Sequence, residues 1–205
     1  GEVDFNFSRG KSTFSDQQTR VVIGQSGGGK LEHDLDAQAS IYWRPLFSQW
    51  RFGISANDAS FSYSPAEVDN FFDADFIFQF YTLNAIFEGQ YWQFSAELVQ
   101  ERLATEGFYV PGFNRDEIGQ GYYLQTSYQL TKDLSVMLRN ERFYANKDDK
   151  NGSKLAASSG GLIPSYFGFH NDTMIGLSYD FSSNLRLNAE YHWMEGGARL
   201  SPIVQ

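Results

Sequence analysis

The segment LRLNAEYHW, residues 185–193, decides the fold. Apolar residues occupy each odd position and polar residues each even position. This period of two is what a β-strand shows when its two faces meet different surroundings. The preceding segment, residues 172–181, alternates in nearly the same way, and only Ser182 to Asn184 lie between the two. The sequence therefore predicts a hairpin of two long antiparallel strands joined by a tight turn.

The same alternation recurs along most of the chain. It is clear in five further segments: 36–44, 50–57, 92–101, 122–130 and 134–139. The segment 76–88 is apolar on both faces, so its register is harder to assign. Two weaker strands, around 3–7 and 19–23, bring the predicted number to about ten.

The connections between these strands alternate in length. Tight turns are expected at 45–48, 89–90, 131–133 and 182–184, whereas the long polar stretches are 60–73, 105–120 and 146–166. Short turns at one end and long loops at the other are typical of outer-membrane barrels. Because a bilayer offers no partner for a free backbone N–H, strands cross it only as a closed barrel. We therefore predict an all-β, antiparallel up-and-down transmembrane β-barrel in the bacterial outer membrane, as a single domain over residues 1–205.

The main alternative is a soluble β-sandwich or a lipocalin-like barrel, in which the apolar face would form the core. Aromatic residues beside the short turns favour the membrane barrel, because such barrels carry aromatic girdles at the bilayer interfaces. The expected girdle contains Trp43, Trp50, Trp92, Tyr128, Tyr179 and Phe181. A sandwich core is expected to be richer in Val and Ile. In the barrel, Leu187 is predicted to face lipid near the middle of the membrane.

The order of turns also predicts where the visible strands run. If the short turns are periplasmic, the strand from Leu185 runs outward, so the chain is expected to end on the outside. Counting back through the segment 19–23 as a strand places the start of the first strand on the outside as well. Single-chain bacterial barrels have an even number of strands, with both termini normally on the periplasmic side. We therefore expect the chain to be an excerpt of a longer barrel.

Composition excludes several other classes of protein. The 205 residues are 41% hydrophobic with a mean hydropathy of -0.42, and no stretch approaches the roughly 18 consecutive apolar residues of a spanning helix. With no cysteine, the chain has no disulfide, thiolate metal site or cysteine nucleophile. The net charge of -9 and the lack of a basic stripe argue against nucleic acid as a partner.

The polar face of the predicted strands supplies candidate pore-lining residues. In a water-filled lumen such side chains tune which ions pass, although they can also simply pair across the wall. The candidates are Arg44, Arg51, Glu97, Glu101, Arg139, Glu141, Asp172, Arg186 and Glu190.

Other motifs point to no catalytic, cofactor or metal site. Residues 24–30 match the glycine and lysine spacing of a phosphate loop after a predicted strand, but Leu31 stands where Ser or Thr belongs and a strand pattern follows. His170 precedes a strand without an identifiable nucleophile. His192 shares a face with Glu190, but two ligands do not make a metal site. No enzyme activity is expected.

Three segments resemble the bacterial phosphate-selective porin O/P-like proteins. These segments are FEGQYWQFSAE at 87–97, GYYLQTSYQLT at 121–131, and the hairpin from IGLSYD at 175–180 to LRLNAEY at 185–191. The resemblance implies a large outer-membrane pore, commonly a homotrimer. Phosphate selectivity is not expected, because no cluster of basic residues is visible on the predicted inner face.

The leading hypothesis is a passive channel for small polar solutes or ions, surrounded by membrane lipid and lipopolysaccharide. A second hypothesis is a structural barrel that is plugged by a partner protein or sheathes one. The third is an outer-membrane hydrolase.

Overall fold

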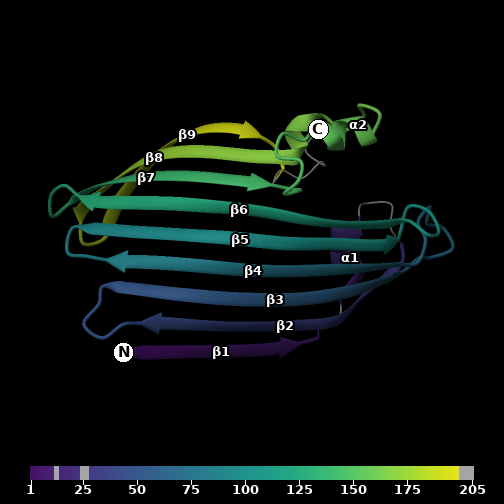
Figure 1. Cartoon of the computed structure of the whole chain (residues 1–205), viewed down its shortest axis with the longest axis horizontal. Helices are drawn as coiled ribbons and strands as arrows, with labels where there is room; N and C mark the ends of the chain where they lie inside the picture. Colours follow the sequence, from purple (N-terminus) through teal and green to yellow (C-terminus); the bar gives the residue numbers. More distant parts are fainter. Residues whose placement is uncertain (12–13, 24–27, 199–205) are drawn as a thin grey trace.

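One nine-stranded antiparallel sheet, in which each strand pairs with the next along the chain, dominates the structure (Figure 1). The computed structural model describes residues 1–11, 14–23 and 28–198. The strands are β1 (Glu2–Gly10), β2 (Lys30–Arg44), β3 (Trp50–Ser64), β4 (Ala74–Glu88), β5 (Trp92–Gly107), β6 (Asn114–Gln129), β7 (Leu134–Tyr144), β8 (Phe169–Ser182) and β9 (Leu185–Gly196). The helices are α1 (Asp16–Ile23), α2 (Ser153–Ser158) and the 3-10 helix η1 (Ser165–Gly168). The predicted all-β, up-and-down architecture is confirmed, with nine strands in place of about ten. Within the described ranges β1 and β9 are not paired, so the sheet is open.

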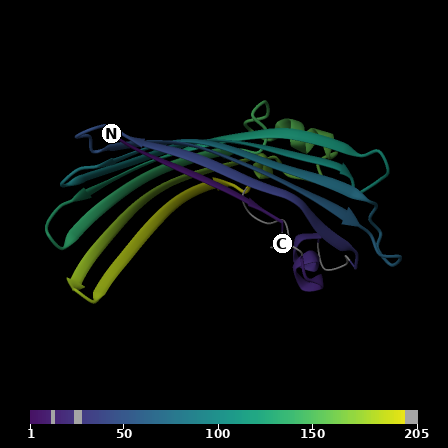
Figure 2. The same cartoon turned by 90° about the horizontal axis from the view of Figure 1, so that it is seen from below.

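The sheet is strongly arched, which gives it a convex and a concave face (Figure 2). Helix α1 lies on the concave side. The ring of Phe14, two residues before this helix, contacts the ring of Phe61 on β3 at 5.7 Å between centroids, so Phe61 points to the concave side. Because successive side chains of a strand point to opposite faces, Phe61 and the pairing register assign every strand residue to one face or the other.

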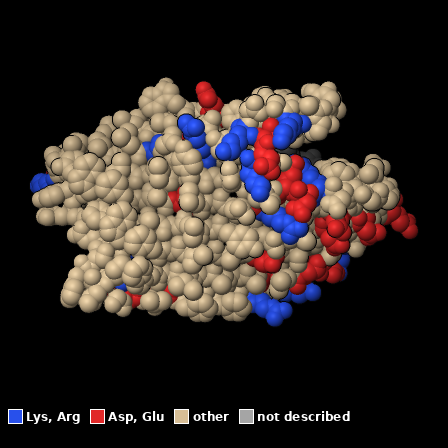
Figure 3. Space-filling view, viewed as in Figure 1, with Lys and Arg blue, Asp and Glu red and all other residues tan. Residues whose placement is uncertain are grey.

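The convex face is apolar over most of its length. Figure 3 looks onto this face and shows charged side chains gathered at the end that carries the long loops. We call the apolar part of this face the belt. Its side chains are exposed, at 50% for Leu177, 56% for Leu187 and 59% for Tyr191. All three residues point away from the concave side, and contact of Leu187 with lipid stays a prediction.

Aromatic rings line the convex face next to the short turns. Trp50 stacks on Phe52 at 5.8 Å between ring centroids, and Trp92 contacts Tyr128 at 4.4 Å. Tyr179 meets Phe181 edge-on at 4.7 Å. The predicted aromatic residues therefore lie together along one end of the sheet. Leu187, which was predicted near the middle of the membrane, pairs with Tyr179 and lies near this end of the sheet.

The strands extend further into two of the predicted loops than the sequence indicated. Strands β2 to β4 have 15 residues and β5 and β6 have 16, so residues 65–73 and 108–113 are all that remain between their paired ends. Charged residues at 115–117 suggested a loop, but they lie in β6, where one cross-strand ion pair joins the Arg102 guanidinium to the Asp116 carboxylate at 2.8 Å. The stretch after β7 does form a long connection, which contains α2 and η1.

The strand predicted at residues 19–23 is wrong, because these residues belong to α1. A capping box starts the helix: the Ser15 backbone N–H donates to Gln18 Oε1 at 2.9 Å, and the Gln18 backbone N–H donates to Ser15 Oγ at 3.3 Å. Two mutually satisfied end groups favour the helix over an extended chain.

The direction of the first strand is also corrected. Glu2 pairs with Arg44 and Gly10 with Asp36, so β1 begins at the short-turn end and runs toward the loops. The earlier expectation counted residues 19–23 as a strand, and replacing that strand by a helix reverses the direction of β1.

Candidate functional site

All nine predicted pore-lining residues lie on the concave face. The register places Glu97 opposite Asn84 and Tyr123, Tyr123 opposite Glu141, and Glu141 opposite Asp172, so these side chains form one row across five strands. The other predicted residues share this parity on their strands. Their shared face is therefore established, and their contact with a pore remains a prediction.

Arg139 and Glu141 form the best-shielded ion pair of this row. The Arg139 guanidinium contacts the Glu141 carboxylate at 2.6 Å, with side-chain exposures of 35% and 12%. It also lies over the Tyr123 ring, 4.9 Å from the centroid. The two residues stand two apart on β7, so alternation brings them to the same side. The pair fixes a charged, rigid patch in the middle of the concave face.

His192 joins Asp172 and Glu190, a combination that spacing alone did not reveal. Its Nδ1 lies 2.8 Å from Asp172 Oδ2 and its Nε2 lies 3.5 Å from Glu190 Oε2. Each ring nitrogen faces a carboxylate, and across the ranges that the structure describes neither this cluster nor any other group of three His, Asp or Glu residues is placed so that it could hold a metal ion. The cluster can hold or exchange a proton at the imidazole, and it adds carboxylate charge to the face.

The remaining predicted residues lie apart from this cluster. Arg44 donates to Glu88 at 3.3 Å near the short turns, and Arg186 is bound by both oxygens of Asp180 on the neighbouring strand. The Arg51 guanidinium lies 5.2 Å from the centre of the Tyr42 ring. These contacts tie neighbouring strands together, so the candidates are spread over the wall and do not form a single site.

An apolar cavity of about 630 Å³ occupies the loop end of the concave face. Its walls come from β3, β4, the segment before α1, and the connection between β5 and β6. The aromatic lining residues are Phe14, Phe61, Phe76, Phe78, Phe80, Phe108, Tyr109 and Phe113. This cavity was not predicted from the sequence, although the segment 76–88, apolar on both faces, was a signal for it. This end of the concave face is chemically unlike the polar row.

One carboxylate organises the loop above the cavity. Asp69 accepts hydrogen bonds from the Tyr63 hydroxyl at 2.6 Å, the Ala66 N–H at 2.8 Å and the Gly28 N–H at 2.5 Å. The hydrogen bond from Tyr63, followed by that from Ala66, lowers the pKa of Asp69 below its ordinary value. Asp69 therefore fastens the start of β2 to the loop that follows β3.

The glycine-rich segment before Lys30 is not a phosphate loop. It is preceded by α1, not by the predicted strand, and it is followed by β2, not by a helix. Residues 24–27 of the motif lie outside the described residues. A Cβ on Gly29 would stand 2.3 Å from the Ser64 carbonyl oxygen, so this glycine permits close backbone packing.

His170 lies at the loop end of β8 and pairs with Phe143 and Gly196 in the register. Neither neighbour is a nucleophile or a carboxylate, so the geometry adds nothing to a catalytic role. The expectation that the chain has no enzyme activity stays a prediction.

In the part of the chain that the structure describes, no helix is both long and apolar enough to cross a membrane. No protein-family model matches the sequence, and no curated protein matches it either. The resemblance to the phosphate-selective porins and the homotrimer that it implies therefore stay predictions. Among solved structures, the chain is similar to the toluene transporter TodX of Pseudomonas putida, with a TM-score of 0.43 and 12% identity over 94% of this chain. It spans 64% of the length of that protein.

Proposed function

We propose that the chain forms the wall of an outer-membrane pore for small polar solutes or ions. The observation that carries the proposal is the contrast between the two faces of one sheet. The convex face exposes large apolar side chains, including Leu83 at 54% and Leu98 at 57%, whereas the concave face carries the row of polar and charged groups. Exposed apolar area of this extent is costly in water and stable in lipid.

The height of the apolar belt supports a membrane location. On β4 the belt runs from Phe87, in the aromatic row, to Gln79, where polar groups begin. These eight steps span roughly 27 Å along the strand, or about 20 Å at a typical barrel tilt, close to the roughly 25 Å belt of known outer-membrane barrels. At its upper edge Gln79 donates to Asp58 and accepts from Arg102, as expected of groups that reach the interface.

The concave charges favour cations as the transported ions. Carboxylates predominate at mid-height, where Glu97, Glu141, Asp172 and Glu190 face the same side as Arg139 and His192. A ring of carboxylates attracts cations and repels anions in a narrow aqueous passage.

Planar-bilayer recording of the full protein tests this function. We expect steady open currents and a reversal potential in a KCl gradient that indicates preference for K⁺. Glu97→Gln should shift that potential toward anions, whereas Asp133→Asn, which removes the same charge from a short turn, should shift it less. Absence of current from protein that has inserted into the bilayer would favour the plugged or sheathing barrel.

The aromatic cavity favours a second candidate function, the passage of small ring-bearing apolar molecules. Removing apolar surface from water is favourable by roughly 25 cal/mol per Å², so an apolar ligand that covers the cavity walls is stabilised there. The polar edge of the cavity is electrically balanced, because Arg115 pairs with Glu117 at 2.5 Å, and this favours a neutral ligand.

Uptake of naphthalene by vesicles, compared between Phe78→Asn and Ile86→Asn, separates this candidate from the first. Ile86 shares the strand and face of Phe78 but lies outside the cavity.

A further inference from the structure

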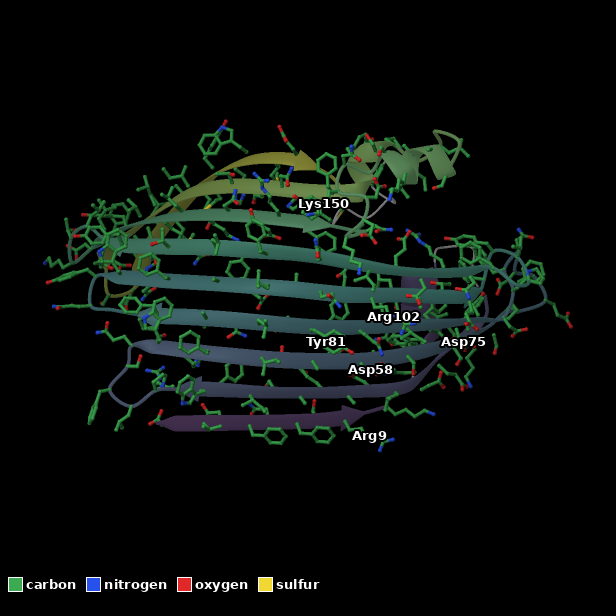
Figure 4. All side chains as sticks on the ribbon, viewed as in Figure 1. Arg9, Asp58, Asp75, Tyr81, Arg102 and Lys150 are labelled. Atoms are coloured by element: carbon green, nitrogen blue, oxygen red, sulfur yellow. The ribbon has the colours of Figure 1, made fainter. Side chains whose placement is uncertain are left out.

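A groove of about 640 Å³ crosses the convex face between β3 and the loop that follows β7. One part is apolar and belongs to the belt, with Ile54, Leu83 and Leu98 among its walls. The other part is formed by Arg142 and Lys150. Figure 4 labels two residues of the groove: Lys150 lies toward the upper edge of the sheet in this view, and Tyr81 lies lower. The groove therefore joins a hydrocarbon-like surface to two cations.

Arg142 and Lys150 have no anionic partner among residues 1–11, 14–23 and 28–198. Arg142 makes neither an ion pair nor a side-chain hydrogen bond there, and Lys150 makes only a contact with the Tyr144 ring, 5.6 Å from its centroid. Arg102 shows the opposite arrangement on the same face, because Asp116 binds it through two hydrogen bonds of 2.9 and 2.8 Å. The sheet compensates Arg102 and leaves Arg142 exposed.

The acidic groups near the two cations do not balance them. The loop above also brings Lys147 and Lys154 to the adjoining hollow, which Asp148, Asp149 and Glu195 share. The Asp149 carboxylate is held within the loop, where it accepts from the Leu155 N–H at 2.9 Å and from Ser153. Four basic side chains thus share this region with three carboxylates, which leaves a net positive charge that attracts an anion.

An exposed arginine on a lipid-facing surface is tolerated best near the interface, where its cost falls to roughly 0–1 kcal/mol. On β7 the apolar convex residues end at Leu138, and Asn140 and Arg142 follow toward the loop end, so Arg142 stands beyond the apolar part of its own strand. At this height the anions that meet a barrel wall are the phosphates of lipid head groups. A guanidinium and an ammonium bind phosphate through charge-assisted hydrogen bonds.

We propose that this groove is a lipopolysaccharide site, in which a lipid A phosphate binds Arg142 and Lys150 and an acyl chain lies along Leu83 and Leu98. The proposal rests on the proposed membrane location. Lipopolysaccharide is favoured over phospholipid because the groove opens at the long-loop end, which in outer-membrane barrels is extracellular, where the outer leaflet carries lipid A.

Native mass spectrometry of the full protein in detergent micelles tests the site, with bisphosphorylated lipid A as the probe. The Arg142→Gln/Lys150→Gln double variant should bind about tenfold more weakly or worse, the loss expected for one charge-assisted hydrogen bond of roughly 1.4 kcal/mol. The matched control is Arg102→Gln, which removes a cation of the same face that Asp116 already neutralises and should leave the affinity unchanged. Lipid A without its phosphates should bind as weakly to the unaltered protein as intact lipid A binds to the double variant.

Equal binding of the two lipids, or affinity retained in the double variant, would overturn the proposal. Displacement of lipid A by an equal amount of phosphatidylglycerol would overturn the choice of lipopolysaccharide. Insertion into vesicles, followed by tryptophan emission, separates this failure from failure of the proposed function. A chain that inserts but binds no lipid A contradicts only the site, whereas a chain that does not insert contradicts the membrane location itself.

Discussion

The convex and concave faces of the sheet are built by the same strands, residue by alternate residue, and yet they follow different rules. On the convex face the belt is apolar at nearly every position, with Thr126 between Phe94 and Leu138 as an exception. On the concave face the polar row around Glu141 gives way to the aromatic cavity around Phe78. Alternation along a strand therefore identifies its faces, whereas the chemistry of each zone on a face follows from the register across strands.

The largest expected effect comes from a charge in the middle of the belt. Leu83 pairs with Ile54 and Leu98, so Leu83→Arg should lower the free energy of unfolding in vesicles by roughly 2 to 4 kcal/mol. Its neighbour Asn84 faces the other way and pairs with Glu97, which can neutralise an introduced cation. Asn84→Arg should therefore be tolerated. Equal losses in guanidinium unfolding of the two variants would mean that the faces are wrongly assigned.

A smaller effect is expected within the concave row. Glu141→Gln removes the charged partner of Arg139 at a site with 12% side-chain exposure, and should cost roughly 1 to 3 kcal/mol. Because an uncompensated cation then faces the passage, K⁺ preference in bilayer recordings should also fall. The isosteric change keeps the side-chain volume. A variant with unaltered stability and selectivity would show that the pair neither braces the wall nor meets the conducted ions.

Charge at the turn end of the belt should cost less still. Leu187 lies beside Tyr179 in the aromatic row, and near an interface an arginine costs only roughly 0–1 kcal/mol. Leu187→Arg should therefore unfold at nearly the same guanidinium concentration as the unaltered protein. A loss as large as that of Leu83→Arg would place Leu187 at mid-belt after all.

The smallest effect concerns the loop end at acid pH. The pKa of Asp69 is lowered in the folded chain, first by the hydrogen bond from Tyr63, so its stabilisation is present above the ordinary aspartate pKa of about 3.9 and is lost as pH falls through the lower folded value. Between pH 7 and pH 2 the unaltered protein should lose more thermal stability than Asp69→Asn. Parallel pH profiles of the two proteins would contradict this role.

The sequence predicts the strands whose two faces differ most, and fails where a second interaction competes with the pattern. Residues 185–193 alternate without interruption, and β9 begins at the predicted Leu185, has the predicted faces and continues to Gly196. Residues 19–23 also look extended, but the capping box of Ser15 and Gln18 selects a helix. The charges at 115–117 suggested a loop because the partner of Asp116, Arg102, comes from the preceding strand.

The candidate site shows the same limit. The concave orientation of all nine predicted residues follows from parity, but the contact of His192 with Asp172 depends on which residues the register places near each other across β8 and β9. The cavity likewise combines residues from four segments distant in the sequence. Only one sequence pattern indicated the cavity, the segment 76–88, which is apolar on both faces.

The irregularity in β2 shows how a strand can hold an extra residue and keep its faces. The pairing with β3 shifts between His33 and Leu35, so Asp34 is an extra residue in one strand. Beyond it the parity of β2 changes: Leu31, an odd-numbered residue, shares the concave face with the even-numbered residues from Asp36 onward, and it is buried at 2% exposure against aromatic rings. Without the bulge, the strict alternation that holds from Asp36 onward would turn Leu31 to the convex face. A bulge is therefore a route by which such a strand can change its length by one codon and keep the same side chains on its lining.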